Sequence, residues 1–170
     1  MGSFGRGLAH LSKGLDTRAV NPHGNAKSVS AETTFSKNMK DAKALSSRLW
    51  PLCETVARRL KARDLAAKTV TLKLKTSGFQ ILTRSRSLAA PTQLAEVLFR
   101  QARQLLDKEA DGRSFRLIGI GASGFAETES ADMPDLLDRR VETYAKVENA
   151  MNAVREKFGA PAIKKGRSLL

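Results

Sequence analysis

The chain of 170 residues has one cysteine, Cys53, and aromatic side chains make up 5% of it. One cysteine excludes an internal disulfide and a cysteine-based zinc cluster, and it suits a reducing cytoplasm. The shortage of aromatics disfavours a surface that stacks the bases of single-stranded nucleic acid. No apolar run reaches 18 residues and the N-terminus has no apolar signal core, so we expect neither a membrane span nor a signal peptide.

Residues suited to catalysis are also missing. The two histidines, His10 and His23, both lie in the N-terminal segment. No phosphate-binding Walker loop occurs, and GIGASG does not match the dinucleotide fingerprint. A two-metal site would need several carboxylates on strands, whereas Glu32 is the one acid in a predicted strand. We therefore expect no catalytic residue and no cofactor in this chain.

Positive charge, by contrast, is abundant and unevenly placed. The net charge is +13, and residues 1–90 hold 17 Lys and Arg against 5 Asp and Glu. Residues 91–170 are nearly balanced, with 13 against 12. A basic half of this kind favours a polyanionic partner, although a solvated basic surface is the simpler alternative.

Hydrophobic periodicity predicts a compact α+β domain. Alternation indicates a strand at 27–35, and an apolar run with no clear outer face indicates another at 115–121. Apolar stripes indicate helices at 38–63 and after Pro91, with Thr92 as the N-cap and Pro51 as a kink or new start. Between the helices, residues 69–87 read as a hairpin around a Thr-Ser-Gly turn. The order is that of a split β-α-β-β-α-β fold: a four-stranded antiparallel sheet with two helices on one face.

The hairpin TVTLKLKTSGFQILTRSRS contains most of the charge that we expect on the sheet. Val70, Leu72 and Leu74 alternate with lysines, so they should face the helices. We expect Lys73, Lys75, Arg84 and Arg86 on the opposite, open face. Such a face, with interspersed hydroxyls, is suited to contacts with phosphates.

The C-terminal part contains an acidic linker and a helix, and each allows two interpretations. The acidic linker 127–138 holds Met133, Leu136 and Leu137, which either form a docking peptide or pack back on the domain. A C-terminal helix from about Arg139 to Phe158 has an apolar stripe with coiled-coil spacing, which either dimerises or packs on its own domain. A basic tail follows.

Several stretches of the sequence resemble a known domain. KSVSAETTF, PLCETVARRLKARDLAAKTVTLKLKTSGF, TRSRSLAAPTQ and FRLIGIGAS, in this order, resemble the C-terminal little finger of Y-family translesion DNA polymerases, in particular the bacterial polymerase IV branch. The resemblance covers about residues 4–126. It implies that residues 1–26 are the end of a thumb and a tether, 27–126 the little-finger domain, 127–138 the linker, and 139–170 the C-terminal helix and tail.

For function, the resemblance implies a cytoplasmic bacterial protein, expected to be monomeric, that binds the backbones of primer–template DNA without reading sequence. Nucleotide addition opposite damaged template and its magnesium would belong to a palm that this chain lacks. By position, the implied DNA-binding residues are Lys27, Ser28, Ser30, Thr34, Lys73, Lys75, Thr83, Arg84, Ser85 and Arg86.

The resemblance also implies docking to the β sliding clamp through a peptide of the form Gln-Leu-Ser/Asp-Leu-Phe. MPDLL aligns with it through Met133, Asp135, Leu136 and Leu137, with the glutamine missing, which should weaken binding. The C-terminal pair Leu169–Leu170 is an alternative position for this motif.

Two other classes remain open at this point. An independent RNA-binding module has the same topology, but it normally displays aromatics on its central strands, where this sequence has Lys, Arg, Ser and Thr. A scaffold protein that dimerises through its last helix is the other alternative.

Overall fold

The computed structural model describes residues 2–20, 24–132 and 140–168. The main helices and strands are, in chain order, α1 (Ser3–Leu11), β1 (Ser28–Met39), α2 (Ala42–Lys61), β2 (Ala66–Thr76), β3 (Ile81–Thr92), α3 (Ala95–Glu109), β4 (Phe115–Ala126) and α4 (Arg140–Phe158). Short 3-10 turns at Thr128–Ser130, Ala160–Ala162 and Gly166–Ser168 complete the described structure.

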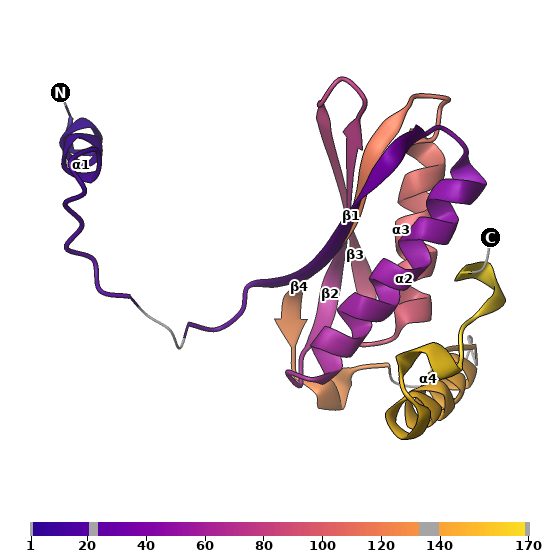
Figure 1. The fold of residues 1–170 in the computed structure, drawn as a ribbon. Coiled ribbons are helices and arrows are strands. Elements are labelled where there is room, and N and C mark those ends of the chain that lie inside the picture. The colour runs from indigo at the N-terminus through magenta and orange to yellow at the C-terminus, as the bar shows by residue number, and fades with distance from the viewer. Residues whose placement is uncertain (1, 21–23, 133–139, 169–170) are drawn as a thin grey trace.

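The four strands form one antiparallel sheet in the order β1-β4-β2-β3. Helices α2 and α3 lie side by side on one face of this sheet, and no helix among the described residues covers the other face (Figure 1). The core lies between the two layers and includes Trp50, whose ring meets that of Phe99 edge-on at 5.3 Å between centroids. The α+β fold and its topology, including a C-terminal helix, are thus confirmed.

Helix α2 begins later than the periodicity suggested, because the preceding strand is longer. Strand β1 continues to Met39, and Asp41 then acts as N-cap, since its carboxylate accepts a hydrogen bond of 2.6 Å from the N–H of Ala44. Pro51 lies inside α2, which continues as one element to Lys61. Leu45, Leu49 and Leu60 of its apolar stripe are fully buried, as expected for the face of a helix that packs on a sheet.

Helix α3 also begins differently from the prediction. Thr92 is the last residue of β3 and not the N-cap; the cap position belongs to Leu94, whose side chain makes no capping bond. The first N–H groups of the helix need other acceptors. The Thr92 hydroxyl accepts from Leu94 N–H at 3.0 Å, and the carboxylate of Glu148 on α4 accepts from Ala95 N–H at 2.9 Å.

Helix α4 packs on its own domain, in line with the second interpretation of its stripe, while Val147 and Phe158 of that stripe are exposed. Its Glu148 forms an ion pair with Lys61 of α2 at 2.6 Å, and its Arg155 pairs with Glu54 of α2 at 2.8 Å. Met151, in the middle of the stripe, is buried. The helix therefore completes the helical layer at the start of α3.

The segment after α4 covers Trp50. The Lys165 ammonium and the Arg167 guanidinium each lie 4.6 Å from the indole centroid, and both pair with the carboxylate of Glu96, at 2.9 and 3.0 Å. The Glu96 side chain is 7% exposed. A carboxylate this buried needs cationic partners, so these two side chains stabilise the first turn of α3.

Helix α1 stands apart from the sheet (Figure 1). Its apolar side chains are exposed, including Phe4 at 79%. The assignment of residues 1–26 to a thumb and tether remains a prediction.

Removal of Arg167 tests the cover over Trp50. We expect Arg167→Ala to lower the free energy of unfolding by about 1–3 kcal/mol, because a buried carboxylate loses a charged hydrogen-bond partner. The measurement is urea unfolding followed by fluorescence of Trp50, the one tryptophan of the chain. The matched control is Lys164→Ala at an exposed position of the same segment. Equal unfolding midpoints for the two variants would contradict the expectation.

Candidate nucleic-acid interface

The open face of the sheet consists of four rows of residues that run across the strands. Directly paired residues in an antiparallel sheet point to the same face, so the register defines these rows. In the order β1, β4, β2, β3 the rows are Ser28, Ser123, Thr69 and Ser87; Ser30, Gly121, Thr71 and Ser85; Glu32, Gly119, Lys73 and Thr83; Thr34, Leu117, Lys75 and Ile81. The first two rows contain hydroxyls and one glycine, and the charges begin in the third.

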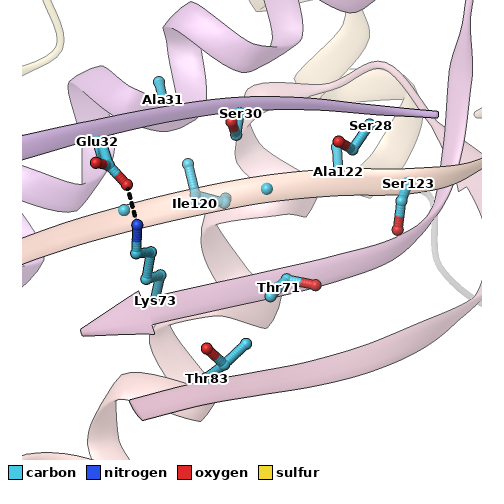
Figure 2. A pocket seen from close by; sticks show the side chains of 12 residues that line it. Ser28, Ser30, Ala31, Glu32, Thr71, Lys73, Thr83, Ile120, Ala122 and Ser123 are labelled. Carbon is cyan, nitrogen blue, oxygen red and sulfur yellow. Dashed lines mark hydrogen bonds and ion pairs between the residues drawn. The ribbon is translucent and has the colours of Figure 1, made fainter. Parts of the chain in front are cut away.

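Two glycines hollow out the middle of this face. Gly119 and Gly121 belong to β4, a central strand, and they leave a depression of about 260 Å³ lined by residues of all four strands (Figure 2). A Cβ atom on Gly119 would lie 2.8 Å from the Cβ of Glu32, closer than real atoms approach. Gly121 has more room, since its nearest neighbour would be the Thr71 Cβ at 3.8 Å.

Most of the residues that the sequence predicted to bind DNA do lie on this face. From β1 come Ser28, Ser30 and Thr34, and Lys27 is exposed directly before that strand. From β2 and β3 come four more: Lys73, Lys75, Thr83 and Ser85. Their placement together agrees with the alternation, whereas their role in binding DNA remains a prediction.

Arg84 and Arg86 are the exception, and their predicted place on the open face is wrong. They pair with Leu72 and Val70, which are buried under the helices, so all four point to the helical side. Arg84 donates to the carboxylate of Glu109 on α3 at 2.7 Å, and Arg86 donates to the side-chain oxygen of Gln104 on the same helix.

The register of the hairpin explains why Arg84 and Arg86 point to the helical side. Lys75 pairs with Ile81, so between Thr69 and Lys75 each even-numbered residue of β2 pairs with an even-numbered residue of β3. The loop between the strands turns at Ser77 and Gly78, as predicted, and Phe79 directly after them has a φ of +66°. The arginines nevertheless remain accessible, because β3 is an edge strand and the side chain of Arg84 is 48% exposed.

Sequence reasoning missed the contribution of β4, because the strand has apolar residues on both sides. Ile118 and Ile120 alternate with the two glycines, and that small–large alternation was the signal available. It also missed Arg59 of α2, which is exposed and donates to the main-chain carbonyl of Ser30 on the edge strand β1. A guanidinium therefore lies beside the β1 edge.

The cations of the open face already have partners within the domain. Lys73 forms a 2.7 Å ion pair with Glu32, which Figure 2 shows as a bridge across β4. The Lys75 ammonium lies 4.9 Å from the ring centroid of Phe79, and the Arg116 guanidinium lies 4.2 Å from the same centroid. The Thr71 and Ser85 hydroxyls hydrogen-bond to each other at 2.9 Å.

Other kinds of site find no support in the described part of the chain. No group of three or more His, Cys, Asp and Glu side chains among the described residues is placed to hold a metal ion. None of the described helices is long and apolar enough to cross a membrane. Cys53 is fully buried, and burial raises the pKa of its thiol, as expected of a structural cysteine.

A second hollow, of about 570 Å³, lies between α2 and α4. Its lining carries both signs of charge, and two of its acids, Glu54 and Glu148, are already paired with bases. Such a surface offers a polyanion less than the open sheet face does.

The candidate clamp peptide, Met133, Asp135, Leu136 and Leu137, lies outside the described residues, as does Leu169–Leu170. Asp132, directly before it, is anchored to the end of β3. Its carboxylate accepts from the Gln93 N–H at 2.8 Å and from the Thr92 hydroxyl, and its own N–H donates to the Pro91 carbonyl at 3.0 Å. Burial raises the pKa of this carboxyl, against the opposing effect of these hydrogen bonds.

Two solved structures are similar to this chain in fold. The little finger of polymerase IV in complex with the β-clamp processivity factor matches with a TM-score of 0.50 and 26% identity, over 56% of this chain and 86% of that one. A Y-family DNA polymerase chimera matches with a TM-score of 0.57 and 16% identity, over 74% of this chain and 36% of that one, which supports the fold alone.

The sequence comparisons identify the family. Residues 26–136 match the impB/mucB/samB family C-terminal domain, and the chain belongs to this family. It is 47% identical to DNA polymerase IV of Brucella melitensis over 97% of this chain and 45% identical to that of Caulobacter vibrioides over 99%. The chain spans 37% and 42% of the lengths of these two relatives. The resemblance to a Y-family little finger is thereby confirmed.

The two glycines of the hollow differ in a way that mutation can test. We expect Gly119→Ala to lower the free energy of unfolding by about 1–3 kcal/mol, because its Cβ would overlap Glu32 and crowd the Ala31 carbonyl. Gly121→Ala is the matched control and should change stability by less than half as much, since its surroundings are open. Urea unfolding of both variants is the measurement, and a larger loss at Gly121 would contradict the packing shown here.

Proposed function

We propose that this chain binds the backbones of duplex primer–template DNA, as the little finger of a translesion polymerase that adds nucleotides opposite damaged template. The observation that supports this most is the open sheet face: rows of hydroxyls with Lys73 and Lys75, without a helix over them. Hydroxyl and ammonium groups are donors to phosphate oxygens, and such contacts carry no sequence information. The similarity to DNA polymerase IV of two bacteria supports the same substrate.

The corrected position of the arginines changes how the duplex would lie. Thr83 and Ser85 would meet one backbone from the open face, and Arg84 and Arg86 would meet it from the outer flank of the same edge strand. On the other edge, Ser28 and Ser30, with Lys27 and Arg59 close by, would meet the second backbone. This arrangement has its polar groups on both edges and a hollow between them.

We propose further that Met133, Asp135, Leu136 and Leu137 dock to the β sliding clamp. Support comes from the aligned motif and from the polymerase IV little finger that was solved in complex with a clamp. The anchored Asp132 brings the chain to the start of this peptide at the end of β3. Soluble action in the bacterial cytoplasm, as a monomer, completes the proposal.

Binding to DNA has a characteristic salt dependence. We expect the chain to bind unrelated duplex sequences with similar affinity, and the logarithm of the binding constant to fall with the logarithm of salt by about 0.9 per phosphate contacted. Lys73→Met with Lys75→Met should weaken binding and reduce that slope by roughly 0.9 for each lysine that contacts a phosphate. Fluorescence anisotropy of labelled duplexes at several salt concentrations measures both.

The matched control for that experiment is Lys146→Met with Lys157→Met, which removes the same charge from α4, away from the open face. It should leave the slope nearly unchanged. Arg84→Ala with Arg86→Ala, tested alongside, should weaken binding if the duplex meets the β3 edge. A flat salt response of the unaltered chain would contradict binding to the DNA backbone, and tighter binding to single-stranded RNA would favour the RNA-binding alternative.

The position of the clamp motif can be tested separately. We expect Leu136→Ala with Leu137→Ala to abolish binding to a β sliding clamp, because these are the two apolar residues that the motif places in the clamp pocket. Binding to the purified clamp of Caulobacter vibrioides, measured by calorimetry, is a suitable assay. Leu169→Ala with Leu170→Ala is the control, and loss of binding in that variant alone would move the motif to the C-terminus.

A further inference from the structure

The open face contains an ion pair between strands that are not neighbours. Glu32 belongs to β1 and Lys73 to β2, and β4 runs between them at Gly119. The Lys73 ammonium nevertheless lies 2.7 Å from a carboxylate oxygen of Glu32 (Figure 2). Strands two apart in a sheet are separated by roughly 10 Å, so both side chains must reach over the strand between them.

Gly119 makes this contact possible. It is the residue opposite both Glu32 and Lys73, and a side chain there would start 2.8 Å from the Cβ of Glu32. With no side chain on the central strand, the two long side chains meet above it. The pair and the hollow are therefore two results of the same glycine.

Glu32 differs in charge from the residues around it on the open face. Among the residues of the four rows, all within the described structure, it is the one acid; the other polar members are hydroxyls and two lysines. A carboxylate repels phosphate and occupies the ammonium that a phosphate would use. Exposed ion pairs of this kind contribute little to stability, and here both side chains are 40% or more exposed. Folding therefore does not account for the presence of this carboxylate.

We propose that Glu32 competes with DNA phosphates for Lys73 and so lowers the affinity of the open face for duplex DNA. This inference rests on the proposed function. In the free chain the ammonium is neutralised within the protein; a phosphate that takes it must displace the carboxylate, which then returns to water. Glu32 acts through Lys73 and is thus a positioning residue. Its consequence is a face that holds DNA loosely enough to release it.

A double-mutant cycle on the full 170-residue chain tests the competition. The variants are Glu32→Gln, Lys73→Met and the two combined, each titrated with a labelled duplex at several salt concentrations. With Lys73 present, Glu32→Gln should tighten binding by about two- to fivefold, as expected for an exposed ion pair, and leave the salt slope nearly unchanged, because Lys73 contacts the same phosphate in both proteins. In the Lys73→Met background the gain should be less than half as large and the slope unchanged, because the carboxylate no longer has an ammonium to occupy.

The control removes a carboxylate of equal exposure elsewhere. Asp107 pairs with Arg103 on α3 at 2.7 Å, and its side chain is 49% exposed, as is that of Glu32. Asp107→Asn changes the net charge equally, away from the open face, and should not affect binding. Glu32→Thr, which suits a strand, repeats the test if the glutamine variant folds poorly.

Three results would overturn the competition: no gain for Glu32→Gln, equal gains with and without the Lys73→Met substitution, or the same gain for Asp107→Asn. Equal gains would mean that Glu32 merely repels DNA through its charge. A loss of affinity would mean that it holds Lys73 ready for phosphate. If the unaltered chain fails to bind any duplex, the proposed function itself fails, and the two failures are thereby distinguished.

Discussion

The pairing of β2 with both of its neighbours decides where almost every other side chain of the domain points. Val70, Leu72 and Leu74 are buried beneath the helices, and the residues directly opposite them on β4 and β3 must share that side. On β4 this requirement places Ile118, Ile120 and Ala122 in the core and leaves the glycines on the open face. A shift of one residue in either pairing would exchange the faces of a whole strand.

The C-terminal part completes the helical layer rather than forming a unit of its own. The N-cap residue of α3 makes no side-chain capping bond, and the N–H of Ala95 and the buried Glu96 take their partners from residues far along the chain. These contacts hold α4 and the segment after it at the start of α3. The match to the family ends at residue 136, whereas the two polymerase relatives align over nearly the whole chain.

The large positive charge of the chain does not translate into a uniformly basic interface. Many cations are paired inside the domain, such as Arg84 with Glu109 and Arg103 with Asp107, and the first two rows of the open face hold hydroxyls rather than charges. Hydroxyls and a few cations that also pair within the protein suit a surface that contacts a nucleic-acid backbone without preference for one sequence or one position. Glu32 fits this picture, because it reduces the charge that Lys73 presents to a ligand.

The elements and their order followed from local patterns, since the periods of strands and helices are properties of neighbouring residues. Alternation in β2 was enough to assign Lys73 and Lys75 to the outside, and the resemblance to a known domain came from sequence alone. Element ends were less certain: the cap at Asp41 and the missing cap of α3 depend on which acceptors come near.

What tertiary structure alone decided was the relation between strands. The sequence of β3 shows two faces but not which of them shares a side with the lysines, because that depends on the length and turn of the loop at Phe79. The orientation of β4 is likewise not given by its own sequence, because both of its faces are partly apolar. Only the pairing with β1 and β2 shows which face lies in the core. The bridge from Glu32 to Lys73 likewise joins residues 41 apart, which meet because a glycine of a third strand lies between them.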